Sequence, residues 1–527
     1  MSREAHLLHE LPWVAAERSP QAIALHDDAG ALTYGGLAED IRRFAAALSA
    51  LNVGRGERVA IYLDKRRETV VASFGAPAQG AVFVPINPLL KPEQVGYILR
   101  DCGVRVLVTS PERLATLVPV LAACPELAHV VVTGAATVTP VQPVHRWNDA
   151  LAAGSPGSHR VIDSDMVGIL YTSGSTGKPK GVVLSHRNMV AGAKSVASYL
   201  ENRSDDVLLA ALPLSFDAGF SQLTTAFHAG AAVVLLNYLL PKDVVKAAAR
   251  HGVTGLTAVP PLWIQLTQVT WPQEATERLR YFANTGGRMP LETLTRLRAL
   301  LPRSKPFLMY GLTEAFRATY LPPEEVDRRP DSIGKAIPNS EILVLRPDGT
   351  PCDAHEPGEL VQRGALVAQG YWNDAEKTAE RFRALPGRES GLVLPEVAVF
   401  SGDTVRRDEE GFLYFIGRRD EMIKSSGYRI SPNEVEEVLY ATELVGECAV
   451  FGVPHDTLGE AVIAIVTWRD GVDQSRLSAL CKERLPAYMV PARIETRPAP
   501  LPRNANGKID RKTIAAEFRA ASEGVSA

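Results

Sequence analysis

Short apolar runs recur from residue 55 to residue 330 and alternate with amphipathic segments of helical length. Each run is rich in β-branched residues and is bounded by Gly, Pro, Asn or Asp, as buried strands are. The runs occupy residues 59–63, 82–86, 104–108, 129–132, 207–212 and 232–236. Buried strands that alternate with helices predict an α/β fold, in which layers of helices cover largely parallel sheets.

The pattern changes after Asp331, where Gly and Pro recur every few residues between short apolar runs at 341–345 and 358–363. Residues 411–416 have the pattern of the second arm of a hairpin. Together these segments predict a small antiparallel, barrel-like subdomain over residues 331–416.

A charged cluster at residues 418–421 follows and separates two parts of the chain. We expect a large N-terminal domain at residues 1–418 and a C-terminal domain at residues 419–527, which is long enough to fold alone. The C-terminal domain opens with a helix, because Ser431 and Glu434 have the spacing of a capping box. Its later strand-like and helical segments, residues 448–453, 461–468 and 475–483, predict a small α+β unit.

Charge and composition exclude several classes of protein. Lys and Arg total 57 against 60 for Asp and Glu, so the chain is not built to neutralise the phosphates of nucleic acid. The 5 cysteines lie far apart without metal-ligand spacing, which fits a reducing compartment. Residues 229–240 are too short an apolar stretch to cross a bilayer, and residues 1–10 lack the apolar core of a signal peptide. We expect a cytoplasmic protein with no membrane span.

A loop rich in glycine and hydroxyl groups follows the strand-like residues 167–170. Glycine lets backbone N–H groups approach a phosphate, the hydroxyls add donors, and the lysines supply charge. Pro179 stands where the common nucleotide-binding loop needs Ser or Thr, so the loop is of another kind. A flexible linker is the alternative, but linkers rarely follow a buried strand. The candidate phosphate-binding residues are Thr172, Ser173, Gly174, Ser175, Thr176, Gly177, Lys178 and Lys180.

Four segments in chain order resemble the motifs of the acyl-adenylate-forming superfamily, which includes acyl-CoA synthetases, adenylation domains of nonribosomal peptide synthesis and firefly luciferase. The segments are YTSGSTGKPKG at 171–181, YGLTEA at 310–315, SGDTVRRDEEGFLYFIGRRDEMIKSSGYRI at 401–430 and PRNANGKIDR at 502–511. Because the matches keep the family's order and spacing, the resemblance covers nearly the whole chain. It implies an AMP-forming ligase whose C-terminal domain acts as a mobile lid.

The second and third motifs also have a direct chemical interpretation. Tyr310 offers a flat face to an adenine, Thr313 a hydroxyl to the α-phosphate, and Glu314 a hard oxygen ligand for Mg²⁺. Asp403 can accept hydrogen bonds from both hydroxyls of a ribose. Taken alone, Thr313 and Glu314 also suit a strand end and Asp403 an ordinary turn, so these roles depend on the surrounding matches.

The resemblance assigns roles to further residues around the nucleotide. It implies that Lys508 bridges the substrate carboxylate and ATP, where its ammonium stabilises the charge that builds at the α-phosphorus. The C-terminal domain would then rotate about Asp420 and bring Lys424 and Gly427 to the site for thioester formation. The remaining adenine- and ribose-binding positions are Gly286, Gly287, Arg288, Gly311 and Arg418.

Phe216 and Asp217 stand where amino-acid-activating members carry Phe-Asp, whereas many acyl-CoA synthetases carry an aromatic-His pair. A substrate ammonium would pair with Asp217 in an otherwise apolar pocket. Alternatively, Asp217 is the N-cap of a helix that begins near Ala218. Arg317 indicates a polar or acidic group on the substrate, or else points to solvent. The resemblance places these residues in the pocket: Phe216, Asp217, Ala218, Ser221, Ala258, Ala283, Thr285, Met309, Arg317 and Ala318.

We therefore expect activation of a carboxylic acid by ATP and Mg²⁺, with an amino acid as the favoured substrate. The reaction would form an acyl-adenylate and release pyrophosphate. The acyl group would then pass to coenzyme A or to the phosphopantetheine of an acyl or peptidyl carrier protein. Two alternatives are an acyl-CoA synthetase for a non-amino acid and a non-catalytic acyl- or nucleotide-binding protein on the same fold.

Overall fold

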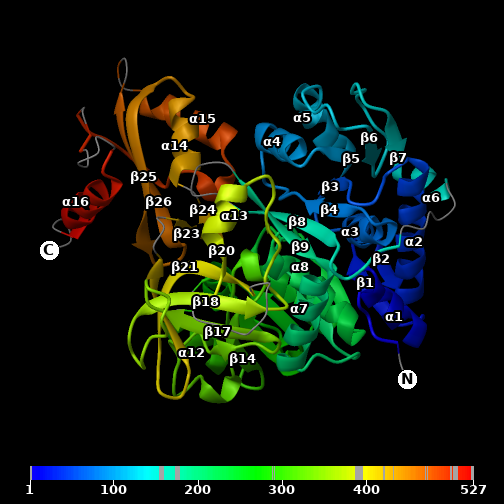
Figure 1. Cartoon of the computed structure of the whole chain (residues 1–527), viewed down its shortest axis with the longest axis horizontal. Coiled ribbons are helices and arrows are strands. Elements are labelled where there is room, and N and C mark those ends of the chain that lie inside the picture. The colour runs from blue at the N-terminus through cyan, green and yellow to red at the C-terminus, as the bar shows by residue number, and fades with distance from the viewer. Residues whose placement is uncertain are drawn as a thin grey trace.

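Two large sheets, a barrel-like sheet and a smaller C-terminal sheet make up the computed structural model of the chain (Figure 1). The structure describes residues 3–153, 160–172, 179–287, 289, 291–385, 396–418, 422–430, 432–468, 471, 473–498, 501–502 and 509–523. All 5 cysteines fall within these ranges, and all are free and buried. Among the described residues, no helix combines the length and apolar character needed to cross a bilayer.

The first large sheet has 8 strands and contains the first four predicted apolar runs. Its core is parallel, and only β9 and β19 at one edge run antiparallel to their neighbours. In spatial order its strands are β19 (Gly370–Tyr371), β9 (Lys180–Ser185), β8 (Met166–Thr172), β4 (Val82–Pro85), β3 (Arg58–Tyr62), β5 (Val104–Thr109), β6 (His129–Val132) and β7 (Val144–Arg146). Its associated helices are α3 (Arg67–Gln79), α4 (Pro92–Asp101), α5 (Pro111–Leu121) and α6 (Trp147–Ala152).

The second large sheet has 9 strands and contains the other two predicted runs. The run at 207–212 is shorter than predicted: β10 ends at Ala210, where the Ala211 N–H turns back to the Leu209 carbonyl at 3.0 Å. In spatial order its strands are β16 (Lys335–Ala336), β15 (Thr319–Leu321), β14 (Lys305–Tyr310), β13 (Tyr281–Asn284), β12 (Gly255–Ala258), β10 (Val207–Ala210), β11 (Ala232–Leu235), β1 (Ile23–Asp27) and β2 (Gly30–Thr33).

The N-terminal segment contributes strands that the pattern analysis did not assign. β1 pairs in parallel with β11, so that Leu25 lies opposite Val233, and β2 pairs antiparallel to β1. The apolar run in β1 is only two buried residues long, Ala24 and Leu25, which is too short to stand out as a strand in the sequence. The helices around this sheet are α1 (Glu10–Arg18), α2 (Tyr34–Ala50), α7 (His186–Tyr199), α8 (Asp217–Ala229), α9 (Pro241–His251), α10 (Pro260–Leu266), α11 (Gln273–Arg278) and α12 (Leu291–Leu300).

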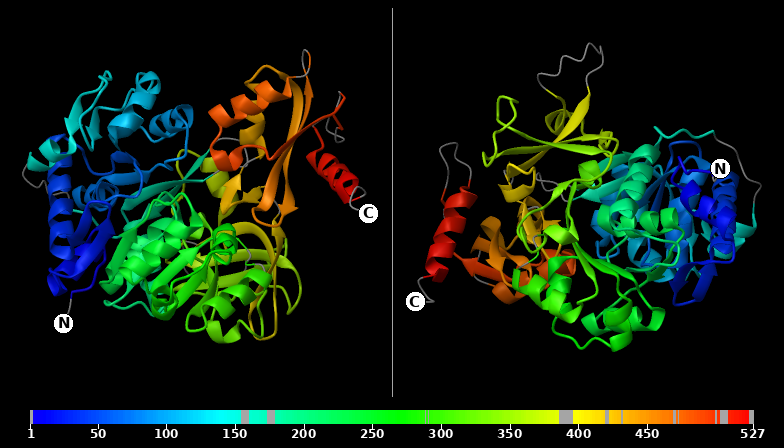
Figure 2. Two further views of the ribbon diagram at one scale, coloured as in Figure 1. Left: turned by 180° about the vertical axis from the view of Figure 1, so that it is seen from behind. Right: turned by 90° about the horizontal axis from the view of Figure 1, so that it is seen from below.

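Helices α3 and α8 join the two large sheets through one hydrophobic core. The rings of Phe83 on β4 and Phe220 on α8 stack at 4.8 Å between centroids, and Phe74 on α3 stacks on Phe220 at 5.7 Å. All three side chains are fully buried. Because α8 packs against both sheets, the position of its first turn is fixed relative to them. Figure 2 shows the two large sheets side by side in the blue-to-green part of the chain.

The predicted barrel-like subdomain is an antiparallel sheet, and the predicted second arm of a hairpin is β22 of the hairpin β21–β22. This arm begins at Leu413, two residues later than predicted, because Gly411 and Phe412 belong to the turn. Its strands are β17 (Ser340–Leu345), β18 (Gly358–Gly364), β20 (Phe382–Ala384), β21 (Val397–Arg407) and β22 (Leu413–Arg418). Two 3-10 helices, η1 (Thr313–Ala315) and η2 (Pro323–Glu325), precede this sheet in the chain, and the short helix α13 (Ala375–Arg381) precedes β20.

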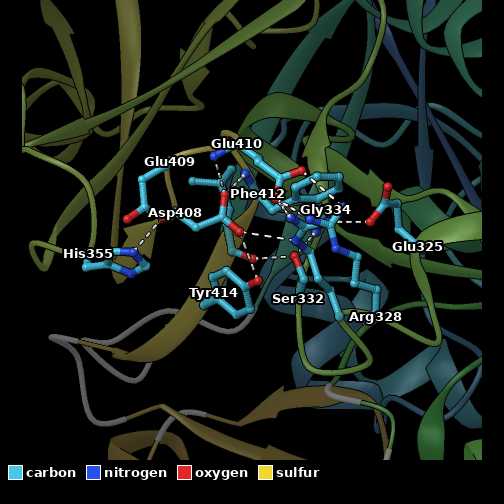
Figure 3. A network of polar contacts seen from close by, with 12 residues as sticks. Glu325, Arg328, Ser332, Gly334, His355, Asp408, Glu409, Glu410, Phe412 and Tyr414 are labelled. Carbon is cyan, nitrogen blue, oxygen red and sulfur yellow. Dashed lines mark hydrogen bonds and ion pairs between the residues drawn. The ribbon is translucent and has the colours of Figure 1, made fainter.

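Ion pairs fasten this hairpin to the segment that enters the barrel-like sheet (Figure 3). Arg329 is 7% exposed, and its guanidinium contacts the carboxylates of Glu325, Asp408 and Glu410. The same guanidinium lies 4.1 Å from the ring centroid of Phe412. Because β22 leads into the predicted hinge, this network anchors the hairpin on the N-terminal side of that hinge to the large domain.

Replacing Arg329 with Met should lower the melting temperature by several degrees, because three carboxylates would lose the cation they share. Arg298→Met is the matched control. Arg298 pairs with Asp327 at the surface, where both side chains are largely exposed and an ion pair contributes little. Differential scanning calorimetry of the two variants checks the prediction, and equal shifts for both would contradict it.

The C-terminal sheet matches the predicted α+β unit closely. Its strands are β23 (Ile423–Ser425), β24 (Tyr428–Ile430), β25 (Val445–His455), β26 (Gly459–Trp468) and β27 (Arg493–Thr496). Its helices are α14 (Pro432–Tyr440), α15 (Gln474–Arg484), η3 (Ala487–Met489) and α16 (Arg511–Glu523). Ser431 of the predicted capping box lies outside the described residues, while Glu434 lies in the first turn of α14.

Candidate functional site

A cavity of about 1540 Å³ lies where the C-terminal sheet meets the N-terminal part of the chain. Its inner wall is made by the residues that follow β3, β4, β10, β12, β13 and β14. The carboxyl ends of parallel strands meet at one edge of a sheet, and open α/β sheets bind ligands there. Its outer wall includes Lys424, Gly427 and Tyr428 from the C-terminal sheet.

Tyr310 and Asp403 meet in this cavity although they come from different sheets. Tyr310 ends β14 and Asp403 lies within β21, and the Tyr310 hydroxyl donates a hydrogen bond to Asp403 Oδ2. Asp403 is 1% exposed, and its backbone N–H donates to Ser401 Oγ at 3.0 Å. A phenol ring and a buried carboxylate held side by side provide the flat face and the hydroxyl acceptor that an adenosine needs.

Thr313 and Glu314 lie in the short 3-10 helix that follows β14. Glu314 Oε1 accepts a hydrogen bond of 2.7 Å from the hydroxyl of Tyr371, and Lys180 Nζ lies 5.4 Å from the centroid of the same ring. Burial lowers the pKa of Lys180. Tyr371 therefore links the carboxylate proposed for Mg²⁺ to a lysine at the end of the predicted phosphate loop.

The two ends of the predicted phosphate loop are held in register by a β-hairpin. Thr172 ends β8 and lies opposite Lys180, which begins β9. Thr172 lines the cavity, so the loop leaves the sheet at the cavity wall. Ser173, Gly174, Ser175, Thr176, Gly177 and Lys178 lie outside the described residues.

The glycines predicted to contact adenine follow β13, separated from it by Thr285. Gly286 and Gly287 line the cavity, and Asn284 Nδ2 donates to the Gly287 carbonyl at 2.8 Å. Gly311 lines the cavity after β14. Arg288 lies outside the described residues.

The turn between β23 and β24 faces this wall across the cavity. A Cβ placed on Gly286 would lie 3.7 Å from the Gly427 carbonyl oxygen, so the two backbones pass close together. Lys424 Nζ lies 4.1 Å from the ring centroid of Phe415. Arg418 ends β22, where only its backbone is described. Asp420 lies outside the described residues.

Lys508 lies outside the described residues, but the chain on either side of it is placed. The Asp510 N–H donates to the Pro502 carbonyl at 2.8 Å, which joins the two sides. Arg511 then pairs with Glu436 at 2.8 Å, and Phe518 packs edge-on against Phe451 of β25. Figures 1 and 2 show α16 at the outer edge of the molecule, beside β25.

Most of the predicted substrate-pocket residues line the cavity, namely Phe216, Asp217, Ala218, Thr285, Met309 and Arg317. Ser221 does not, because it lies one turn into α8, where it borders a separate pocket of about 20 Å³. Ala258 lines neither space, since its side chain packs in the hydrophobic core behind β12. Ala283 and Ala318 are also core residues.

The alternative prediction for Asp217 is wrong. α8 begins at Asp217 itself, and the N-cap residue is Phe216, which makes no side-chain capping bond. A carboxylate in the first helical turn still interacts favourably with the helix dipole. Asp217 is half-buried and lies on the cavity wall rather than above the helix end.

Three residues with contacts at this site carry no role in the sequence analysis, and two of them, Val259 and Tyr428, line the cavity. Tyr371 lies outside the four motifs and is visible only once β19 pairs with β9. Tyr428 lies inside the third motif, and its ring stacks on Tyr488 at 3.6 Å and meets Phe216 edge-on at 5.2 Å. Val259 follows β12 and packs against the turn at Gly427. Only Tyr428 had a signal in the sequence, namely its place in a motif.

The chain matches two family models in order. Residues 13–372 match the AMP-binding enzyme family, and residues 434–508 match the AMP-binding enzyme C-terminal domain. Among curated proteins, the chain is 30% identical over 520 residues to an L-proline--[L-prolyl-carrier protein] ligase of Pseudomonas fluorescens, covering 97% of this chain and 99% of that protein. It is 32% identical over 515 residues to a feruloyl-CoA synthase of Amycolatopsis, covering 95% of this chain and 97% of that protein.

Solved structures agree. The fold superimposes on o-succinylbenzoate CoA synthetase from Bacillus subtilis with a TM-score of 0.82 and 28% identity, covering 95% of this chain and 97% of that one. The predicted fold class and the predicted kind of enzyme are both confirmed. The chain belongs to the AMP-binding enzyme family and is an AMP-forming ligase.

Proposed function

We propose that the protein activates an amino acid as an aminoacyl-adenylate and passes the aminoacyl group to a pantetheine thiol. AMP-forming ligases use ATP with Mg²⁺, release pyrophosphate and transfer the acyl group to coenzyme A or to a carrier protein. The observation that carries the amino-acid assignment is the position of Asp217. Its carboxylate lies on the wall of the cavity, at the start of a helix fixed between the two large sheets.

The residues around the nucleotide support the first step. Asp403 and Tyr310 would hold the ribose and the adenine, and the Thr313 hydroxyl would bind the α-phosphate. Glu314 would hold Mg²⁺, because a carboxylate is a hard oxygen ligand and Tyr371 fixes its orientation through Oε1. The metal supplies charge neutralisation for the phosphates when it is bound. Lys508 would stabilise the charge that develops between the substrate carboxylate and the α-phosphorus.

The turn at Gly427 supports the second step. Lys424, Gly427 and Tyr428 line the cavity, which is the placement that the resemblance assigns to thioester formation. Gln94 Nε2 on α4 donates to Glu434 Oε1 on α14 at 3.0 Å and holds the C-terminal sheet in this position. A thiol arriving between these walls would reach the adenylate from the side of Gly427.

A substrate panel with Asp217→Ala tests the amino-acid assignment. The unmodified enzyme should release pyrophosphate with amino acids at least about 10-fold faster than with the matching acids that lack the amino group. Asp217→Ala and the isosteric Asp217→Asn should both remove this preference, because each deletes the charge that pairs with the substrate ammonium. Asp456→Ala, an exposed carboxylate at another part of the cavity rim, is the matched control and should leave the preference unchanged.

The second candidate is an acyl-CoA synthetase for a non-amino acid. The similarity to feruloyl-CoA synthase, at 32% identity, favours it as much as the prolyl-carrier ligase favours an amino acid. Equal use of amino acids and their deamino counterparts by the unmodified enzyme would establish this reading and remove the role of Asp217. Running the panel with coenzyme A and with a phosphopantetheinylated carrier protein identifies the acceptor in the same experiment.

A further inference from the structure

We propose that Arg317 binds a second anionic group on the substrate, so that the acid activated here carries a carboxylate besides the one that reacts. The inference rests on the proposed function and deepens it by naming the substrate class. Combined with an ammonium at Asp217, it makes the substrate an amino acid with an acidic side chain.

The backbone turns Arg317 into the cavity and holds it there. Phe316, directly before it, has φ 56°, a left-handed conformation that is strained for a bulky residue. Its ring is fully buried and keeps the turn in place. Gln362 Nε2 donates to the Arg317 carbonyl at 2.6 Å, and the Ala318 N–H donates to the Tyr310 carbonyl at 3.2 Å. The position of Arg317 is therefore fixed before any ligand arrives.

The guanidinium of Arg317 has one partner on the protein and two unused donors. Arg317 is 3% exposed, and its Nη1 donates to Thr285 Oγ1 at 3.1 Å. Neither its Nε nor its Nη2 donates to a residue that the structure describes, and Nε is fully buried. Within the described ranges, no carboxylate forms an ion pair with Arg317. The sequence-based alternative, an arginine that points to solvent, is excluded by its burial.

Two spaces border Arg317. Arg317 lines both the large cavity and the side pocket of about 20 Å³, whose other polar members include Ser221, Gln222 and Thr257. A space of that size holds about one water molecule, so it does not receive a substrate group. A ligand that reaches Arg317 must therefore lie in the large cavity.

The chemistry of the Arg317 guanidinium selects a carboxylate. A buried cation without a counter-ion is costly, and an anion supplied by the ligand offsets that cost. The planar guanidinium of an arginine carries paired N–H donors that match the two oxygens of a carboxylate. The corresponding amide offers one oxygen and no charge. A site built in this way discriminates between the acid and its amide by about 10²-fold or more.

Pyrophosphate release with matched pairs tests the inference: aspartate against asparagine, glutamate against glutamine, and succinate against its monoamide. The acid of at least one pair should have a kcat/KM about 100-fold above that of its amide. In Arg317→Met, which keeps the length of the side chain, this ratio should fall to about 1. Arg317→Lys keeps the charge but not the planar pair of donors, so its ratio should lie between these two values.

Arg187→Met is the control, because Arg187 is an exposed arginine that pairs with Asp163 away from the cavity. It should leave the ratio unchanged. Preference of the unmodified enzyme for the amides or for neutral acids would overturn the inference and leave the proposed function standing. The same holds if Arg317→Met lowers kcat/KM equally for the acid and for its amide. Pyrophosphate release with no carboxylic acid at all would overturn the proposed function, and this inference with it.

Discussion

Lys508→Ala should lower the rate of adenylation by about 10²–10³-fold, the usual effect of removing one preorganised charge from a transition state. Thioester formation from a supplied acyl-adenylate should stay largely intact. The reason lies in the division of labour between two faces of the C-terminal sheet. The turn with Lys424 and Gly427 faces Gly286 across the cavity, whereas α16, the helix that follows Lys508, packs on β25 and borders the cavity through Arg511, Ala515, Ala516 and Arg519.

The two half-reactions are measured separately, by pyrophosphate release and by thioester yield from the preformed adenylate. Lys482→Ala is the control, because Lys482 is an exposed lysine in the last turn of α15. An equal fall in both half-reactions of Lys508→Ala would show that the C-terminal domain does not alternate between two roles.

Gly427→Leu should have the opposite effect, with thioester output lost and pyrophosphate release retained. A Cβ at Gly427 would lie 2.8 Å from Val259 Cγ1, so a side chain there collides with the wall of the large domain when the two walls meet as they do here. Adenylation in the rotated arrangement would escape the collision. A bulky side chain at this turn would also occupy the space through which the pantetheine thiol must pass.

Backbone strain is the competing explanation, because Gly427 has φ +82° and a side chain is strained there whatever its surroundings. Gly471→Leu separates the two effects: Gly471 has φ +74°, and a Cβ there meets nothing within 4 Å. If strain dominates, both variants will show a lowered melting temperature, and Gly427→Leu will lose both activities together. Partial recovery of thioester output in Gly427→Ala with Val259→Ala, relative to Gly427→Ala alone, would support the collision.

Local pattern was enough to predict several strands of each sheet. Strands such as β4 (Val82–Pro85) consist of apolar, fully buried residues, so burial and length identify them without knowledge of their partners. Helix α14, the first helix of the C-terminal domain, was equally predictable from the capping pattern in its sequence. In each case the determining forces act within a few residues of one another.

Contacts between distant segments could not be predicted in this way. Tyr371 reaches Glu314 only because the short strand β19 pairs with β9, and nothing near Tyr371 in the sequence indicates that pairing. The burial of Arg317 depends on the strained turn at Phe316 and on Thr285, which follows β13. Family motifs placed Asp403 and Tyr310 in one site, but their direct hydrogen bond required the tertiary structure.

The parallel pairing of β1 with β11 affects how this protein must fold as it leaves the ribosome. Leu25 emerges early in synthesis, but its partner Val233 is added only after every strand of the first sheet except β19 has been made. Until then β1 can pair only with β2, and its other edge stays open, which is the situation in which apolar strands associate with other chains. Loss of the first 33 residues would leave β11 as an open edge, with Val233 and Val234 available to strands of neighbouring molecules.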